Sequence, residues 1–217
     1  MDSKNELVFD MGKSSGYLAY DEQFITIGKD SVPKAQIIDI LNNQTIAIRI
    51  LNNVTSEEVE EFIRAHTTEE NRICLVTDHD HAYHSVVINL KFEKTQQCLF
   101  HFIKIIDRKV NDIIKKNKPT DDEVKKLKEY GNRIKSIFLV DDIKDFIYRL
   151  NRFFKLWDDV PEDLKKYYNK KIVRDMHKLT QHLFDPNVPK TNNILESKFS
   201  GAQQKSLKLD LKQLKDV

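Results

Sequence analysis

The sequence predicts an α/β fold in which a mixed sheet is followed by a block of helices and one returning helix. Alternating apolar and polar residues predict a strand over 16–29 and two further strands over 35–41 and 45–51. Residues 103–183 instead repeat their apolar side chains at the three- and four-residue spacing of amphipathic helices. A last helix is expected to begin near Asn193, so the chain ends on an element that can return to the sheet.

A hairpin turn and a helix start can be placed from local signals. Asn42 and Asn43 separate the second and third strands, and asparagine tolerates the left-handed backbone that tight hairpins require. Thr55 and Glu58 have the spacing of a capping box. They predict a helix that ends near His66 and packs one apolar face on the sheet.

A second pair of strands is expected after that helix. The continuous apolar run over 72–77 predicts a buried parallel strand, and 96–100 predicts a shorter one. Asp78 follows the first of these, at the carboxyl end where open α/β sheets bind ligands. The chain is therefore divided into a lead-in (1–15), the first part of the core (16–105), a helical insertion (106–185) and the closing helix of the core (186–217).

Composition excludes several classes of protein. The 217 residues are 40% hydrophobic and 32% charged, which suits a folded domain with an insertion. The net charge of +2 gives no argument for a nucleic-acid partner. Two cysteines, Cys74 and Cys98, exclude a disulfide framework and fit a reducing compartment. No apolar run reaches the roughly 18 residues of a membrane span, and residues 1–6 lack the apolar stretch typical of a signal peptide, so we expect no membrane association.

Three carboxylates lie at the end of an expected element or at the centre of an expected strand, from where a fold can bring them together. They are Asp21, Asp78 and Glu196. Carboxylates that converge repel one another unless cations lie between them, and Mg²⁺ binds through a few carboxylates plus substrate phosphates. The pattern therefore suggests metal-dependent chemistry on a phosphodiester. Asp10 and Asp39 are alternatives to the first carboxylate, although Asp39 lies beside the expected hairpin turn, where aspartate is common.

The other two carboxylates have simpler explanations as well. Asp78 can cap the helix that follows it, and Asp80 replaces it as the second carboxylate if the strand ends two residues later. Asn193 and Glu196 have the spacing of a capping box. A glutamate in the first turn of a helix also lies at the positive end of the helix dipole, which helps to keep it ionised for a metal.

Three motifs in order sharpen this hypothesis. They are the run LVTDHDHAY that contains Asp78, the C-x-x-H pattern of Cys98 and His101, and the T-N-N-x-x-E pattern from Thr191 to Glu196. Together they resemble the DDE transposases of the Mutator-like superfamily, which include many insertion-sequence transposases. The resemblance covers nearly the whole chain. It implies an RNase H-like mixed sheet with an all-helical insertion before the last catalytic helix.

The resemblance also implies an activity. Asp21, Asp78 and Glu196 would hold two Mg²⁺ ions, with Mn²⁺ as a substitute, for DNA strand cleavage and strand transfer at transposon ends. The expected partners are transposon ends, target DNA and further copies of the chain on DNA, in the nucleoid-associated cytoplasm of a prokaryote or the nucleus of a eukaryote. Cys98, His101, Asn192 and Asn193 are expected to support the site or contact substrate, and Lys104, Arg108, Lys109, Lys198 and Lys205 to contact DNA.

Two roles remain open for His101, contact with a substrate phosphate and support of a metal-bound carboxylate. Zinc is not predicted, because a structural zinc site needs four ligands and Cys74 is the only cysteine besides Cys98.

Relatives in this superfamily carry a DNA-recognition region before the first aspartate and continue beyond the glutamate. We therefore expect this chain to bind DNA weakly, without sequence preference, and not to transpose by itself. Two alternatives stay open, a truncated remnant that binds DNA or transposase without cutting, and another RNase H-like nuclease.

Overall fold

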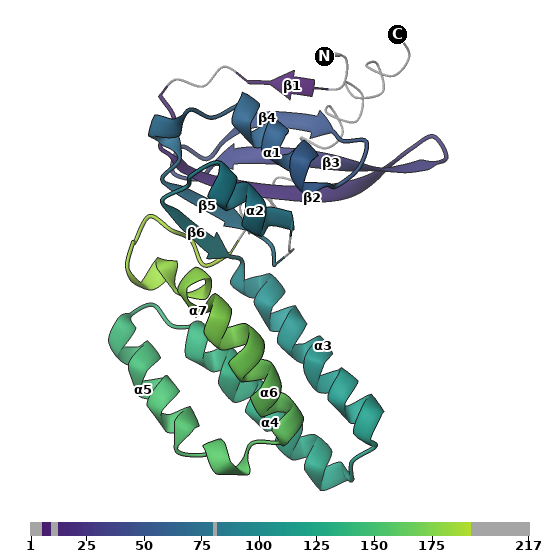
Figure 1. Cartoon of the computed structure of the whole chain (residues 1–217), viewed down its shortest axis with the longest axis vertical. Coiled ribbons are helices and arrows are strands. Elements are labelled where there is room, and N and C mark those ends of the chain that lie inside the picture. Colours follow the sequence, from purple (N-terminus) through teal and green to yellow (C-terminus); the bar gives the residue numbers. More distant parts are fainter. Residues whose placement is uncertain (1–5, 10–12, 80–81, 192–217) are drawn as a thin grey trace. The chain divides into compact units, whose positions relative to one another are not determined.

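The structure is a computed structural model that describes residues 6–9, 13–79 and 82–191. The chain forms two compact units (Figure 1). One contains the described residues up to Thr95, and the other runs from Gln96 to Lys190.

A six-stranded sheet with the order β1-β4-β3-β2-β5-β6 organises the strands. β2, β3 and β4 pair antiparallel through tight turns, β1 pairs antiparallel with β4, and β5 runs parallel to β2. With the helices that follow, this mixed sheet confirms the predicted α/β class, an RNase H-like sheet with a helical insertion. The strands are β1 (Glu6–Val8), β2 (Tyr17–Ile27), β3 (Asp30–Asp39), β4 (Gln44–Ile50), β5 (Cys74–Thr77) and β6 (Lys94–Gln97).

The predicted hairpin turn and capped helix are both present. Asn43 joins β3 to β4 with a left-handed φ of 50°. Thr55 caps α1 (Ser56–Ala65), where its hydroxyl accepts a hydrogen bond from the amide of Glu58 at 3.3 Å. The Glu58 carboxylate accepts from the amides of Asn52 and Asn53, so it ties down the loop before the helix rather than completing the expected box.

Some elements differ from those expected. The lead-in expected over 1–15 contains β1, and the strand expected over 96–100 ends at Gln97 because the chain is helical from Leu99 onward. A helix, α2 (Ala82–Asn89), is the next element after β5. A short 3₁₀ turn (Glu69–Asn71) precedes β5.

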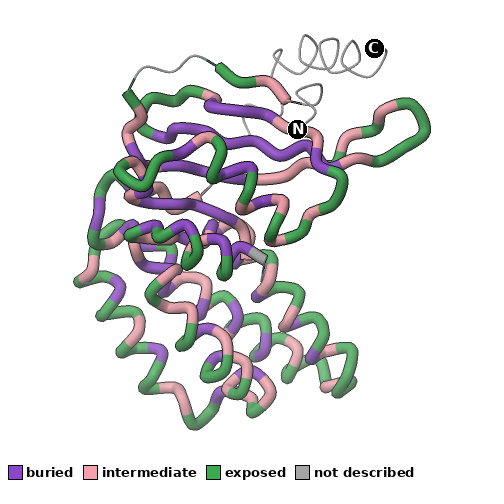
Figure 2. Tube along the Cα trace, turned by 45° about the horizontal axis from the view of Figure 1, so that its top comes forward, coloured by how far each residue is buried: buried purple, intermediate pink, exposed green. Residues whose placement is uncertain are grey.

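The core of the first unit lies between one face of the sheet and the helices α1 and α2. The central strands are mostly buried, whereas the tip of the β2–β3 hairpin is exposed (Figure 2). Burial of this much apolar surface is the main source of stability in a unit of this size. Its buried side chains include Leu18, Tyr20, Ala35, Ile37, Val59, Phe62, Ile63, Leu75, Tyr83, Val86 and Leu90.

Gly16 holds the start of β2 against β5. Its φ is 81°, and its carbonyl accepts hydrogen bonds from the amides of Ile73 at 3.1 Å and Cys74 at 3.0 Å. A Cβ at this position would lie 2.8 Å from the Ile73 side chain. A side chain is therefore opposed both by the left-handed backbone and by close packing.

We expect Gly16→Ala to lower the free energy of unfolding by about 2 kcal/mol, measured by urea denaturation. Gly28→Ala is the matched control, because Gly28 has a φ of 66° and a methyl group added there would have no atom within 4 Å. It isolates the cost of the backbone conformation, which is about 1 kcal/mol. Equal losses in the two variants would show that packing against Ile73 contributes nothing.

The second unit is helical, and no strand occurs among its described residues after Gln97. Thr120 and Glu123 form a capping box at the start of α4, and Asp142 caps α5 by accepting from two backbone amides. Gly131 lets α4 approach α3, since a Cβ there would lie 2.8 Å from Val110. The helices are α3 (Leu99–Asn117), α4 (Asp121–Phe138), α5 (Ile143–Phe154), α6 (Glu162–Tyr167) and α7 (Val173–Leu179), with a π-helical turn (Tyr168–Ile172) between the last two and 3₁₀ turns at Trp157–Asp159 and Gln181–Leu183.

Aromatic side chains fill part of the core of this second unit. Trp157 packs edge-on against Phe153 and Tyr168, with ring centroids 5.8 and 5.3 Å away. The single tryptophan is therefore a packing residue, as its position in an apolar run indicates. Among the described residues, no helix combines the length and apolarity that crossing a bilayer requires.

Candidate functional site

Asp21 and Asp78 come from neighbouring strands of the first unit. β5 runs parallel to β2, with Ala19 opposite Val76. If this register is continued by two residues, Asp21 on β2 is level with Asp78, the residue directly after β5. Both side chains are partly exposed. An extended register would thus align two carboxylates at the end of β5, where a sheet of this kind binds ligands.

The negative charge of this region acts on a buried tyrosine of α2. Burial and the Glu22 carboxylate raise the pKa of Tyr83, and Asp78 and Asp21 raise it further. Burial and Glu22 likewise raise the pKa of Tyr20, and Tyr83 and Asp21 add to the shift. The charges of Asp21, Glu22 and Asp78 thus all act on the hydroxyl of Tyr83.

Glu22 is held by two tyrosine hydroxyls. The hydroxyl of Tyr20 donates to Glu22 Oε1 at 2.6 Å, and the hydroxyl of Tyr83 donates to Glu22 Oε2. The two rings meet edge to face, with centroids 5.6 Å apart. The neighbouring carboxylates of β2 therefore differ, because Glu22 belongs to a partly buried hydrogen-bond network on the side of the sheet covered by α2.

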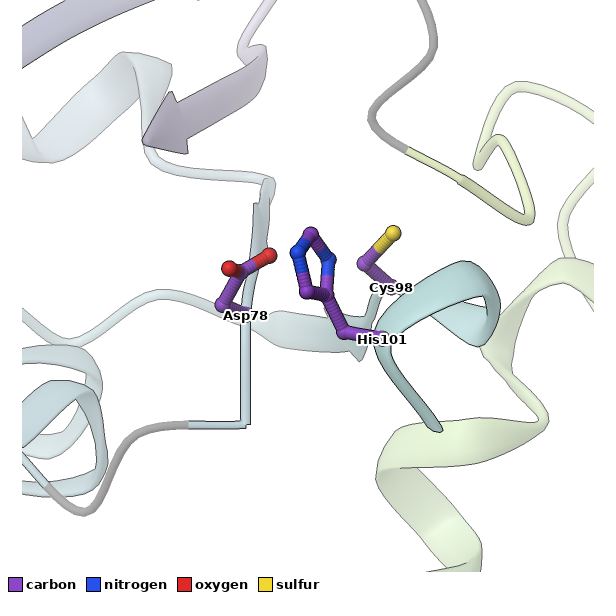
Figure 3. A group of neighbouring side chains, drawn as sticks. All are labelled: Asp78, Cys98 and His101. Carbon is purple, nitrogen blue, oxygen red and sulfur yellow. The ribbon is translucent and has the colours of Figure 1, made fainter. Parts of the chain in front are cut away.

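A second group of side chains includes Asp78. One ligand atom each from Asp78, Cys98 and His101 lies within 4.8 Å of the other two (Figure 3). Cys98 directly follows β6 and is buried, and His101 lies in the first turn of α3. A thiolate, an imidazole and a carboxylate together suit Zn²⁺ better than Mg²⁺, which prefers oxygen ligands. This group offers three ligands among the described residues, one fewer than a structural zinc site requires.

Asp39, the alternative to Asp21, stabilises a turn. Its fully buried carboxylate accepts hydrogen bonds from the Ser15 amide at 2.7 Å and the Ser15 hydroxyl at 2.6 Å. It also accepts from the amide and side chain of Asn42 at 3.0 and 3.2 Å, and from the Ser14 hydroxyl at 3.3 Å. These contacts fix the β3–β4 turn against the segment before β2, which is a sufficient structural role for a buried aspartate.

The basic residues expected to contact DNA lie on α3 where they are described. Lys104 and Arg108 are exposed, and Lys109 is partly buried. The Lys104 ammonium lies 3.9 Å from the centroid of the Phe100 ring, and that of Lys109 lies 5.6 Å from the centroid of Tyr167. These cations are thus held by aromatic faces while Lys104 and Arg108 remain accessible to a phosphate.

Several expected site residues lie outside the described residues, so the structure places none of them. They are Asp10, Asp80, Asn192, Asn193, Glu196, Lys198 and Lys205.

Sequence reasoning missed Glu22 and Tyr83 as neighbours of the two aspartates. Glu22 directly follows Asp21, and Tyr83 is the last residue of the LVTDHDHAY run, so both lie beside residues that the sequence singles out. The contact between them joins α2 to β2 and follows from no local pattern.

Comparison with known proteins gives one relationship. No protein-family model matches the chain. The chain is similar to a protein of Methanobrevibacter smithii described as "Insertion element ISM1 uncharacterized 48.3 kDa protein", with 26% identity over 194 residues. The match covers 89% of this chain and 48% of that protein, so the chain spans about half the length of its relative.

Proposed function

We propose that this chain is the catalytic part of a DDE transposase from an insertion element, and that it cleaves and joins DNA strands with divalent metal ions. The observation that carries the proposal is the parallel register of β2 and β5, with Ala19 opposite Val76, which would align Asp21 with Asp78 if it continued by two residues. The mixed sheet and the similarity to an insertion-element protein support the same assignment. The finer identification, the Mutator-like superfamily, rests on the three motifs of the sequence.

Asp21 and Asp78 are proposed to supply oxygen ligands to two Mg²⁺ ions, for which Mn²⁺ would substitute, and Glu196 to supply the third carboxylate. Such a metal pair activates the attacking oxygen and stabilises the leaving oxygen of an in-line displacement. The partial exposure of both described aspartates fits this role, because a substrate phosphate must reach the metals.

The remaining roles are proposed from position and chemistry. Cys98 and His101 would support Asp78, with which they share a cluster of ligand atoms. Lys104 and Arg108 would contact DNA phosphates from the exposed side of α3. The proposed partners are transposon ends, target DNA and further copies of the chain assembled on DNA, and the proposed compartment is the one that holds the cell's DNA.

The proposal is tested by incubating supercoiled plasmid with the purified chain and Mg²⁺ or Mn²⁺. We expect nicked product whose appearance requires metal, and we expect EDTA to abolish it. Joining of a labelled oligonucleotide to the plasmid through its 3′-hydroxyl would show strand transfer. Nicking in the presence of EDTA, or bound but uncut plasmid with either metal, would contradict the proposal.

We expect the double variant Lys104→Gln/Arg108→Gln to weaken DNA binding and to flatten its salt dependence. Each lost phosphate contact should lower the slope of log K against log [salt] by about 1. Fluorescence anisotropy of a labelled duplex at several salt concentrations measures this slope. The control is Lys125→Gln/Lys128→Gln on α4, which removes the same charge from exposed positions near three acidic residues. The same change of slope in both variants would show that DNA binding depends on net charge alone and not on Lys104 and Arg108 in particular.

A further inference from the structure

A hydrogen bond ties α2 to β2 beside the two aspartates. Tyr83 is the second residue of α2, and its hydroxyl donates to Glu22, the residue after Asp21 on β2. Tyr83 is only 6% exposed, and its ring packs against Tyr20 in the core below α2. A hydrogen bond to a charged carboxylate in this environment is stronger than one between neutral groups.

Asp78 is close to this tie in the sequence. Tyr83 follows Asp78 by five residues, so a short connection joins the end of β5 to the start of α2. One end of this connection is held to β2 by the parallel pairing of β5, and the other by the bond from Tyr83 to Glu22. Asp78 therefore lies between two attachments to the strand that carries Asp21.

We propose that Tyr83 is a positioning residue that, by donating to Glu22, fixes the start of α2 on β2 and so holds Asp78 beside Asp21. The consequence for metal binding rests on the proposed function, because it requires both aspartates to bind the metal. Glu22 is assigned to the hydrogen bonds with the two tyrosines, and Asp21 is assigned to the metal. The proposal thus gives different roles to two adjacent carboxylates of β2.

The electrostatics of the site favour this arrangement. Burial and Glu22 raise the pKa of Tyr83, and the two aspartates raise it further. The hydroxyl therefore keeps its proton at neutral pH and remains a donor. A phenolate in its place would repel Glu22 instead of binding it.

Tyr20 provides a matched control. Its hydroxyl donates to the other oxygen of the same carboxylate, and its side chain is fully buried. Tyr20→Phe and Tyr83→Phe each remove one hydroxyl from Glu22. Tyr20 lies on β2 itself, however, so its hydrogen bond to Glu22 joins two residues of one strand and cannot restrain α2.

The test compares Tyr83→Phe and Tyr20→Phe with the unaltered protein in two measurements. The first is amide hydrogen exchange of α2 without metal, and the second is the affinity for Mn²⁺, measured by electron paramagnetic resonance. We expect Tyr83→Phe to speed exchange in α2 and to weaken Mn²⁺ binding, each by about tenfold, the factor that the loss of one hydrogen bond to a charged group implies. Tyr20→Phe should change both by less than about twofold, although the two variants lose similar stability in urea.

Equal exchange in the two variants would overturn the positioning role, and so would faster exchange in Tyr83→Phe with unchanged Mn²⁺ affinity. Failure of the proposed function gives a different result, in which the unaltered protein binds no Mn²⁺ or Asp78→Asn leaves that binding unchanged. The exchange measurement needs no metal, so it still decides whether Tyr83 anchors α2.

Discussion

Replacement of Asp78 by asparagine is expected to abolish Mg²⁺-dependent strand cleavage while the protein stays folded. Asparagine keeps the size of the side chain but removes the charge that a divalent cation requires. Metal ions contribute several kcal/mol to stabilisation of the transition state, so the rate should fall about a thousandfold or more. Plasmid nicking under single-turnover conditions measures this loss, and urea denaturation checks the fold.

Asp30→Asn is a suitable control for this experiment. Asp30 lies at the exposed tip of the β2–β3 hairpin, and its replacement removes the same charge from the same unit. We expect cleavage by this variant at the rate of the unaltered protein. Normal cleavage by Asp78→Asn would mean that another carboxylate binds the metal, and Asp80 would be the first to test.

Asp39→Ala should destabilise the first unit by about 3–5 kcal/mol. The carboxylate of Asp39 is fully buried and accepts hydrogen bonds from backbone amides and side chains around the β3–β4 turn. Its removal leaves those donors buried without their acceptor, which is among the costliest single changes in a folded protein. Urea denaturation followed by circular dichroism measures the loss.

This prediction also separates the two candidates for the first carboxylate. Asp39→Asn keeps one acceptor oxygen and should give a folded protein that binds Mn²⁺ with nearly native affinity. Asp21→Asn should retain stability and lose that binding. The opposite pattern, with metal affinity lost in the Asp39 variant and kept in the Asp21 variant, would assign the metal to Asp39.

Much of the first unit could be predicted because its signals are local. Alternation identifies β2 and β3, the Asn42-Asn43 pair identifies their connection to β4, and Thr55 identifies the start of α1. Asp78 could be singled out because it directly follows a continuous apolar strand. Each of these features depends on neighbouring residues along the chain, which a single sequence shows.

Features that depend on distant contacts could not be predicted. β1 is three residues long and is held through Glu6, which accepts hydrogen bonds from Arg49 and pairs with His66. The parallel register of β2 and β5, which pairs Ala19 with Val76, is likewise set by strand pairing between distant segments. The hydrogen bond from Tyr83 to Glu22 also joins distant segments, and the spacing of hydrophobic residues does not predict it.

The central claim is that Asp21 and Asp78 bind the same metal centre. The most direct measurement is an anomalous difference map from crystals of this chain soaked in MnCl₂. We expect a manganese peak within coordination distance of carboxylate oxygens from both aspartates. A peak bound by Asp78 with Cys98 and His101 but not by Asp21, or no peak at either aspartate, would contradict it.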